Sequence, residues 1–187
     1  MRIIGGTARS RLIDAPRGMD TRPTQDKVRE SLFNILQWEI EDGAVLDLFA
    51  GSGALALEAL SRGASSAVMV DNSREAAKII QGNIDRLGFS PKATVIQADW
   101  RAAADQLARQ KAVFDLVFLD PPYKLTDTGE MCRYLLEKGI LAPCAKLIVE
   151  HAWGTPPRLD TGLRASDLRR YGSTGITFVT LSAKEAD

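Results

Sequence analysis

The sequence predicts an α/β fold built on a mostly parallel sheet. Short apolar runs alternate with longer helical stretches over most of the chain, and this alternation is typical of βαβ units. The last two apolar segments instead follow each other across Gly172-Ser173-Thr174-Gly175, which predicts an antiparallel hairpin that closes the sheet. With 187 residues, of which 45% are hydrophobic, the chain fits a single globular domain covering 1–187.

The helical and apolar patterns predict the elements in order. Pro23-Thr24 opens a helical pattern that runs to about Trp38, with Thr24 as its N-cap, so residues 25–40 form the predicted N-terminal helix. The predicted strands are Val45–Phe49, Ala67–Val70, Thr94–Ala98, Phe114–Leu119, Leu147–Val149, Leu168–Tyr171 and Ile176–Leu181. The predicted helices between them are Ala54–Arg62, Ser73–Leu87, Arg101–Gln110 and Gly129–Lys138, and Asn72 with Glu75 resembles a capping box.

The net charge of zero conceals an uneven distribution. Residues 1–29 contain seven basic and three acidic residues, which leaves 17 basic and 21 acidic residues in the rest of the chain. We therefore expect residues 1–24 to form a basic N-terminal arm on a mildly acidic body. Such an arm is typical of polyanion binding, although a solvated tail would have the same composition.

Composition also excludes several classes of protein. Cys132 and Cys144 form neither a CxxC motif nor a Cys/His cluster, so we expect no metal site and a reducing compartment. No apolar run is long enough for a membrane helix, and the first residues lack the apolar core of a signal peptide. We expect a cytoplasmic protein, and a monomer because no long exposed apolar stripe is evident.

The first predicted strand runs into a glycine turn that is typical of nucleotide binding. Gly51 to Ala56 fits the pattern G-x-G-x-x-A, and Asp71 ends the next strand 20 residues after Gly51, where a carboxylate can bind ribose hydroxyls. This pattern fits either NAD or S-adenosylmethionine. Asp47 in the strand favours the second, because a carboxylate there suits a cationic sulfonium amino acid better than a pyrophosphate.

The most specific motif is Asp120-Pro121-Pro122-Tyr123, directly after the strand Phe114–Leu119. An exocyclic amine of a base is a poor nucleophile because its lone pair is delocalised into the ring. Asp120 can accept a hydrogen bond from one N–H of such an amine, and the Pro121 carbonyl can accept the other. Tyr123 offers an aromatic face for a base swung out of its stack. The motif therefore predicts methyl transfer to an amino group.

The glycine turn and the Asp120 motif together resemble those of a known family. Asp47-Leu48-Phe49-Ala50-Gly51-Ser52-Gly53 and the Asp120 motif look like class I S-adenosylmethionine-dependent methyltransferases that act on amino groups. A narrower match lies in Arg2–Gly6, in Thr21–Thr24 with Asp26–Glu30, in Leu55–Ala64 and in Tyr171-Gly172. These segments are similar to the RsmD family of bacterial 16S ribosomal RNA guanine-N2 methyltransferases, of the guanine(966)-N(2) type.

The resemblance implies a Rossmann-like fold, a substrate and a set of site residues. Its sheet would have seven strands in the order 3-2-1-4-5-7-6, with helices on both faces. The substrate would be ribosomal RNA in an assembled or assembling small subunit. S-adenosylmethionine would contact Asp47, Phe49, Gly51, Gly53, Asp71, Asn72, Asp99, Trp100 and Asp120. The catalytic residues would be Asp120, Pro121, Pro122 and Tyr123, and RNA would contact Arg9, Arg11, Arg22, Thr24, Arg29 and Tyr123.

Other functions stay open at this stage. Adenine-N6 methylation of DNA or RNA uses the same chemistry, but Asp120 and Cys144 are too close in sequence for a target-recognition insertion. Protein-glutamine methyltransferases favour Asn before Pro-Pro. An NAD dehydrogenase would need a catalytic acid, and His151, the only histidine, is interpreted as structural. A non-enzymatic RNA-binding module would not need the glycine turn.

Overall fold

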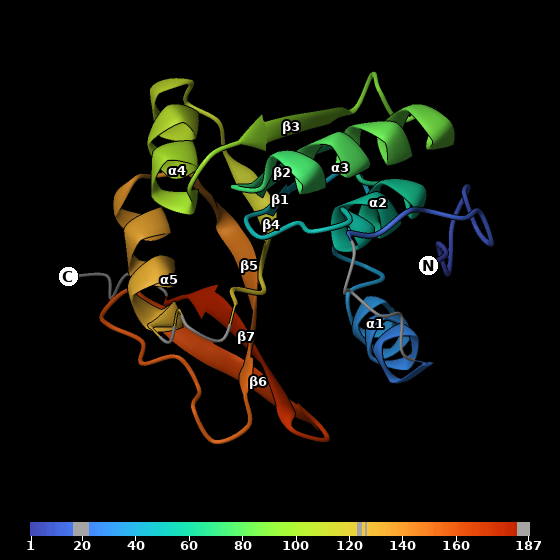
Figure 1. Ribbon diagram of the computed structural model, residues 1–187. Coiled ribbons are helices and arrows are strands. Elements are labelled where there is room, and N and C mark those ends of the chain that lie inside the picture. Colours follow the sequence, from blue (N-terminus) through green and yellow to red (C-terminus); the bar gives the residue numbers. More distant parts are fainter. Residues whose placement is uncertain (17–22, 123–124, 126, 183–187) are drawn as a thin grey trace. The chain divides into compact units, whose positions relative to one another are not determined.

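The computed structural model describes residues 1–16, 23–122, 125 and 127–182, with only the backbone described for 23–25. The chain divides into two compact units, Met1–Ala103 and Ala104–Asp187, and Figure 1 labels their helices and strands. The strand order is β3-β2-β1-β4-β5-β7-β6, which confirms the order implied by the resemblance. That the chain forms one methyltransferase domain stays a prediction.

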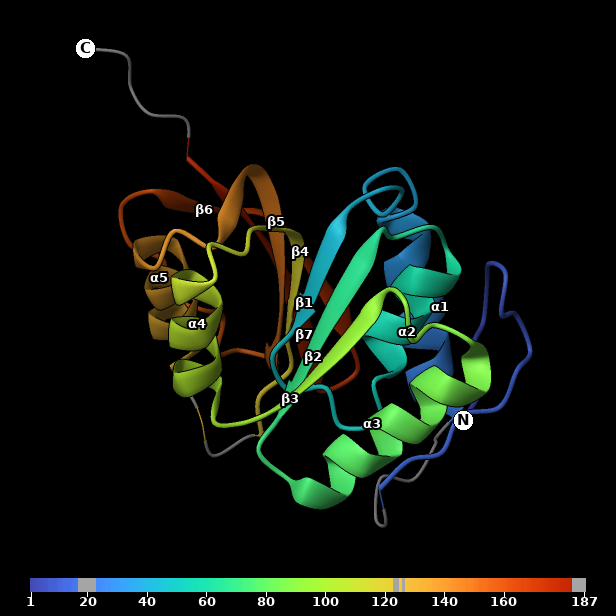
Figure 2. The same ribbon diagram turned by 90° about the horizontal axis from the view of Figure 1, so that it is seen from above.

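The first unit contains a three-stranded parallel sheet. Its strands are β1 (Ala44–Asp47), β2 (Ser66–Asp71) and β3 (Ala93–Gln97), and β2 pairs with β1 and β3 in parallel. The helices α2 (Ala54–Ser61) and α3 (Arg74–Leu87) lie on one side of these strands (Figure 2). Helix α1 (Pro23–Ile35) precedes the sheet, and α4 (Trp100–Arg109) follows β3 and spans the boundary between the units.

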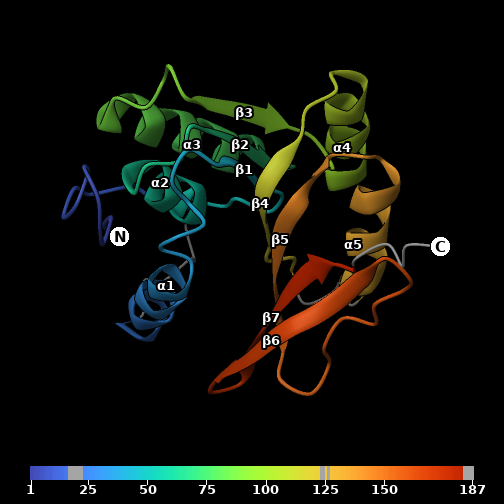
Figure 3. The same cartoon turned by 180° about the vertical axis from the view of Figure 1, so that it is seen from behind.

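The second unit contains the other four strands. The strand β4 (Phe114–Leu119) pairs in parallel with β5 (Leu141–Ala152). The strands β6 (Leu163–Tyr171) and β7 (Thr174–Leu181) form the predicted antiparallel hairpin, and β7 also pairs with β5 (Figure 3). Helix α5 (Thr128–Glu137) connects β4 to β5 and packs against β5. Only two residues, Gly172 and Ser173, separate β6 from β7, fewer than the four expected, because Tyr171 already pairs with Thr174.

The N-terminal segment 1–16 packs against α2. Arg2 and Leu12 form an antiparallel bridge, and Ile3, Ala8 and Ile13 are buried. The main-chain N–H groups of Ile4 and Gly5 each donate to the Glu58 carboxylate at 2.7 Å. A Cβ at Gly6, whose φ is +73°, would overlap the Ser61 carbonyl. The segment is therefore part of the folded body, and the predicted arm is wrong for residues 1–16.

Two helix ends differ from the sequence prediction. Helix α1 ends at Ile35, because the chain then turns through hydrogen bonds such as Glu39 N to Leu36 O and brings Ile40 into the core. Trp38, predicted to lie in this helix, is 86% exposed. Helix α3 is capped by the Ser73 hydroxyl, which accepts from Ala76 N at 3.3 Å. The predicted capping box at Asn72 is thus one residue too early.

Candidate active site

The glycine turn after β1 is held by Asp71 at the end of β2. Gly51 N donates to Asp71 Oδ2 at 2.9 Å, and Ser73 N donates to Asp71 Oδ1 at 2.9 Å. Ala50 N also donates to the Val70 carbonyl at 2.9 Å. Each carboxylate oxygen can accept a further hydrogen bond, so Asp71 can hold the turn and still bind a ligand hydroxyl.

Gly53 begins α2 in a conformation that requires glycine. Its φ of 79° lies in the left-handed region, and a Cβ there would come within 3.1 Å of Met69 Sδ and 3.2 Å of Leu57 Cδ1. The backbone conformation therefore favours glycine, and a side chain would also have to displace the ends of Met69 and Leu57 by a few tenths of an ångström. Gly51 also has a positive φ, 56°. The structure thus gives a local physical reason for both glycines of the motif.

The other predicted cofactor residues of the first unit occupy different environments. Asp47 is 1% exposed at the end of β1, Phe49 is half-buried and Asn72 is exposed. Asp99 Oδ1 accepts from Arg101 N at 2.9 Å at the start of α4, as an N-cap residue does. Trp100 is 7% exposed, with the Arg101 guanidinium carbon 4.6 Å from the centroid of its ring.

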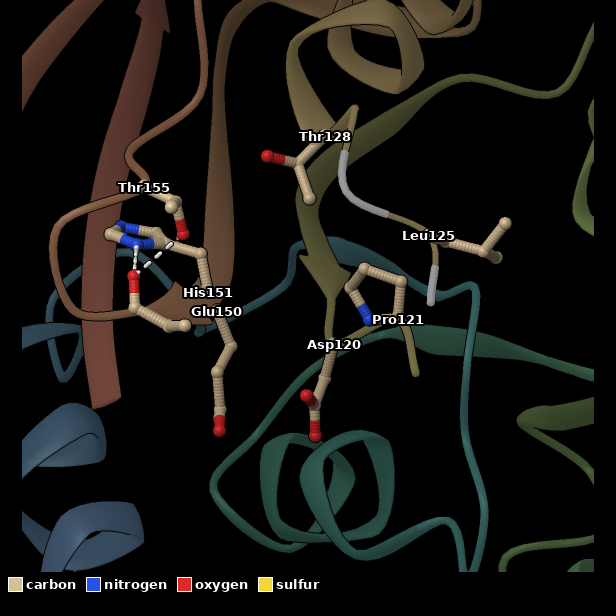
Figure 4. A pocket seen from close by; sticks show the side chains of 8 residues that line it. Asp120, Pro121, Leu125, Thr128, Glu150, His151 and Thr155 are labelled. Atoms are coloured by element: carbon tan, nitrogen blue, oxygen red, sulfur yellow. Dashed lines mark hydrogen bonds between the residues drawn. The ribbon is translucent and has the colours of Figure 1, made fainter. Parts of the chain in front are cut away.

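A pocket in the second unit contains the start of the Asp120 motif (Figure 4). Its volume is about 210 Å³, and it is lined by Asp120, Pro121, Leu125, Thr128, Glu150, His151, Ala152 and Thr155. Pro122 is exposed, and its carbonyl accepts from Leu125 N at 2.8 Å. Tyr123 lies outside the described residues. The pocket is large enough for a planar ring, because cavities of about 150 Å³ hold benzene.

Strand register brings a second carboxylate beside Asp120. Leu119 of β4 pairs in parallel with Val149 of β5, so the next residue of each strand, Asp120 and Glu150, lie side by side. Glu150 was not among the predicted site residues, although it follows the predicted strand Leu147–Val149 just as Asp120 follows Phe114–Leu119. Its position beside Asp120 depends on the pairing of these two strands, which no local pattern predicts.

Both carboxyl groups of this pair hold their protons more tightly than usual. Protein around the pocket replaces water that would hydrate their charges, and this burial raises the pKa of Asp120 to about 6 even though the residue has an exposed surface. Burial, and secondly the charge of Asp120, raise the pKa of Glu150 to about 8. Two carboxylates in one pocket repel each other, so their charged forms are stabilised only by hydrogen-bond donors, or one of them keeps its proton.

His151 is fixed by hydrogen bonds on both ring nitrogens. Nε2 lies 2.8 Å from the Thr177 hydroxyl, and Nδ1 lies 2.9 Å from the Ala152 carbonyl. Because a carbonyl can only accept, Nδ1 carries a proton and donates it to Ala152 O, and Nε2 shares the second hydrogen bond with the Thr177 hydroxyl. A Cβ at Gly175, which pairs with His151 across the strands, would overlap the imidazole. These contacts agree with the structural interpretation of His151.

The structure places the predicted RNA-binding residues in three situations. Arg9 is exposed. Arg11 donates to the carbonyls of Leu87 and Arg86 at the end of α3, with 3.1 Å between Nη1 and Leu87 O. Arg29 is 6% exposed and donates to Arg2 O at 2.6 Å and Asp26 Oδ1 at 3.1 Å. Burial lowers the pKa of Arg29. Its guanidinium joins α1 to the N-terminal segment and does not face solvent.

Two further residues predicted to bind RNA are Arg22 and Thr24. Arg22 lies outside the described residues, and Thr24 is described only as a backbone position in α1, one residue after the helix begins at Pro23. Thr24 is therefore inside the helix and is not its N-cap.

The two cysteines differ in exposure: Cys132 is buried, whereas Cys144 is exposed. Over 1–16, 23–122, 125 and 127–182, no three metal-binding side chains are grouped to hold an ion. None of the described helices is long and apolar enough to span a membrane.

Comparison with known proteins places the chain in a family. The family model described as "Conserved hypothetical protein 95" matches residues 1–180. "Ribosomal RNA small subunit methyltransferase D" of Escherichia coli (strain K12) is 39% identical over 150 residues, which cover 80% of this chain and 74% of that protein. YlbH of Bacillus subtilis (strain 168) is 35% identical over 177 residues, which cover 94% of this chain and 96% of that protein.

A solved structure agrees with these sequence comparisons. The structure of yhhF from Escherichia coli superposes with a TM-score of 0.85 at 33% identity, covering 98% of this chain and 99% of that one. The resemblance noted from the motifs is thereby confirmed over nearly the whole chain. The protein belongs to the family described as Conserved hypothetical protein 95, the RsmD family.

Proposed function

We propose that the protein transfers a methyl group from S-adenosylmethionine to the exocyclic N2 amine of a guanine in 16S ribosomal RNA, of the guanine(966)-N(2) type. The observation that carries the proposal is the position of Asp120. It follows β4 directly and lines a pocket of about 210 Å³ whose described residues include two carboxyl groups as hydrogen-bond acceptors, those of Asp120 and Glu150. Membership of the RsmD family, which includes a named small-subunit methyltransferase, supports ribosomal RNA as the substrate.

The glycine turn of the first unit supports the cofactor. Gly53 has the positive φ that favours glycine in this turn, and the Asp71 carboxylate keeps accepting capacity at the end of β2. In the proposal, Asp47, Gly51 and Gly53 contact the methionine part, Asp71 the ribose and Asp99 the adenine. When bound, S-adenosylmethionine supplies an electrophilic methyl group. The buried carboxylate of Asp47 suits the positive charge of its amino acid part.

Asp120 and Pro121 activate the amine in the proposed reaction. Asp120 accepts a hydrogen bond from one N–H and the Pro121 carbonyl accepts the other, so the nitrogen lone pair is withdrawn from the ring system and directed at the methyl carbon. With S-adenosylmethionine bound, the amine nitrogen would take the methyl carbon from the sulfonium, whose sulfur would leave as a neutral thioether. The amine then gives one proton to the Asp120 carboxylate, from which it passes to solvent.

The proposed partner is ribosomal RNA in an assembled or assembling small subunit, bound by a monomer in the cytoplasm. Arg9 is the described arginine of the predicted RNA-binding set that is best placed for a phosphate, because Arg11 and Arg29 bind carbonyl groups of the protein. Arg22, Thr24 and Tyr123 keep their proposed RNA contacts from the sequence motif alone.

One experiment tests substrate and position together. The purified protein is incubated with methyl-labelled S-adenosylmethionine and, in parallel, with unmethylated 16S RNA, small subunits or duplex DNA, and the labelled nucleoside is identified. We expect N2-methylguanosine at a single position in the RNA or subunit sample. Label in N6-methyladenosine, in DNA or in protein glutamine would refute the proposal in favour of the corresponding alternative. Calorimetry with S-adenosylmethionine tests the cofactor separately, since an enzyme of this kind must bind it.

A further inference from the structure

The pocket around Asp120 offers more hydrogen-bonding capacity than the activation of an amine requires. Asp120 and Glu150 follow paired positions of β4 and β5, and their carboxyl groups extend toward the same side of the pocket (Figure 4). Among the lining residues that the structure describes, none is a lysine or arginine. The third titratable group, His151, is already bonded to Thr177 and Ala152. Two adjacent acceptors are therefore available to a ligand.

An independent feature also indicates that the pocket binds a polar ligand. Thr128 at the start of α5 is 3% exposed, and its hydroxyl has no hydrogen-bond partner among the described residues. This hydroxyl points from α5 toward the side of the pocket formed by His151 and Thr155 (Figure 4). Gly129 fits so closely against the Arg158 backbone that a Cβ there would overlap it. The start of α5 is therefore tightly packed, and the Thr128 hydroxyl is a buried polar group beside the cavity. A polar ligand in the pocket could supply its missing hydrogen bond.

The two adjacent acceptors match one base. Guanine carries two neighbouring donors on its Watson–Crick edge, the N2 amine and N1–H. Beside the amine of adenine or cytosine lies a ring nitrogen that accepts hydrogen bonds. A second carboxylate next to Asp120 therefore attracts guanine and repels the other two amino bases.

We propose that Glu150 is the specificity-determining residue of the site, accepting a hydrogen bond from N1–H of the target guanine while Asp120 holds the N2 amine. This inference rests on the proposed function, because it concerns the same substrate and pocket. Burial and the charge of Asp120 raise the pKa of Glu150 to about 8, so the empty pocket favours a bound proton. When guanine is bound, its two N–H donors would stabilise the negative charges of the two carboxylates, as the bound proton does without the base.

The test changes the hydrogen-bonding groups of the protein in one variant and those of the base in one RNA substrate. Glu150→Gln keeps the shape and one acceptor oxygen but adds an amide donor. 2-Aminopurine keeps the 2-amino group of guanine, but its N1 accepts. RNA with guanine or 2-aminopurine at the mapped nucleotide is offered, naked or assembled as methylation requires, and kcat/KM is measured for both bases with both proteins.

We expect the wild-type protein to prefer guanine and Glu150→Gln to reduce that preference at least tenfold, since the amide can donate to N1 of 2-aminopurine. A tenfold change corresponds to about 1.4 kcal/mol, which is within what a single well-formed base contact contributes to discrimination. The missing O6 of 2-aminopurine affects both proteins equally and cancels in the ratio of preferences. Glu137→Gln, at a mostly exposed glutamate of the same unit, is the matched control and should leave the preference unchanged.

The outcomes separate this inference from the proposed function. If the wild-type protein methylates guanine and Glu150→Gln has the same base preference, the role of Glu150 is refuted and the proposed function stands. If the wild-type protein methylates no guanine, the proposed function is refuted and the Glu150 assignment with it. Thermal unfolding and S-adenosylmethionine binding of Glu150→Gln show whether any loss of activity reflects misfolding.

Discussion

Glu58 and Glu150 are both glutamates enclosed by protein, but their partners are opposite in kind. Glu58 is fully buried and accepts three donors, from Ile4 N, Gly5 N and Arg62 Nε, each at 2.7 Å. Glu150 lies in a pocket beside a second carboxylate, and its pKa is raised to about 8. A carboxylate with its donors in place holds a structure together. A carboxylate that faces a cavity and has no such donors among the residues that the structure describes is available to a ligand.

The largest expected effect is on turnover and comes from a substitution in the pocket that contains Glu150. Asp120→Ala should lower kcat at least about 100-fold, as is typical when a group that takes part in proton transfer is removed. S-adenosylmethionine affinity should stay the same, because Asp120 acts on the amine. Single-turnover methyl transfer and calorimetry measure the two quantities. Asp115→Ala, at an exposed position of the same strand, is the control, and equal turnover of the two variants would contradict the role of Asp120.

On the structural side, Glu58→Gln should destabilise the fold by about 3 kcal/mol, as expected when one partner of a buried charged network is neutralised. The amide would turn one N–H toward a main-chain N–H that now donates to the carboxylate. Urea unfolding measures the change. Glu41→Gln, on the surface, should be neutral. A loss below about 1 kcal/mol would show that the three hydrogen bonds contribute no more than a surface ion pair.

The pH dependence of stability sharpens the contrast. Glu150 has a raised pKa in the folded protein, so between the ordinary pKa of glutamate, 4.5, and about 8 the folded state holds a proton that the unfolded state releases. Folding is therefore progressively weakened as pH rises through this window, and the penalty is complete above pH 8. Glu150→Gln removes it and should be more stable than the wild type at about pH 9, by an amount on the order of 1 kcal/mol after solvent screening. Melting temperatures at about pH 5 and about pH 9 test this, and a constant difference would refute it.

The smallest effects concern two arginines of the N-terminal segment. Arg11→Ala should cost about 0.3–1 kcal/mol of stability, because the guanidinium binds carbonyls at the negative end of α3. Arg9→Ala should leave stability unchanged and reduce the salt dependence of RNA binding by about one phosphate contact. Unfolding and filter-binding measurements on both variants distinguish the roles. An unchanged salt dependence for Arg9→Ala would remove Arg9 from the RNA interface.

Local patterns were sufficient to predict most of the fold. The strand Phe114–Leu119 was predicted with the bounds that β4 has, and α2 and α5 differ by a residue or two from their predicted ranges. The glycine turn was also predictable, because positive φ and close packing at Gly53 act within one turn. Each of these features depends on residues that are neighbours in the sequence.

Features that depend on tertiary contacts were not predictable in the same way. The basic N-terminal segment looked like a free arm because Ile3, Ala8 and Ile13 follow neither a helical nor a strand period, yet all three are buried. Glu150 was missed because its partner lies 30 positions earlier and meets it only through the pairing of β4 with β5. In both cases the interaction joins residues that no local pattern connects.

The contact between Gly175 and the His151 imidazole constrains how this site can change during evolution. Any side chain at position 175 would overlap the ring, so position 175 cannot gain a side chain while histidine is at 151. The two positions, 24 residues apart but paired across β5 and β7, should therefore covary. A relative with alanine at 175 is expected to carry a smaller residue than histidine at 151, together with a changed shape of the pocket wall.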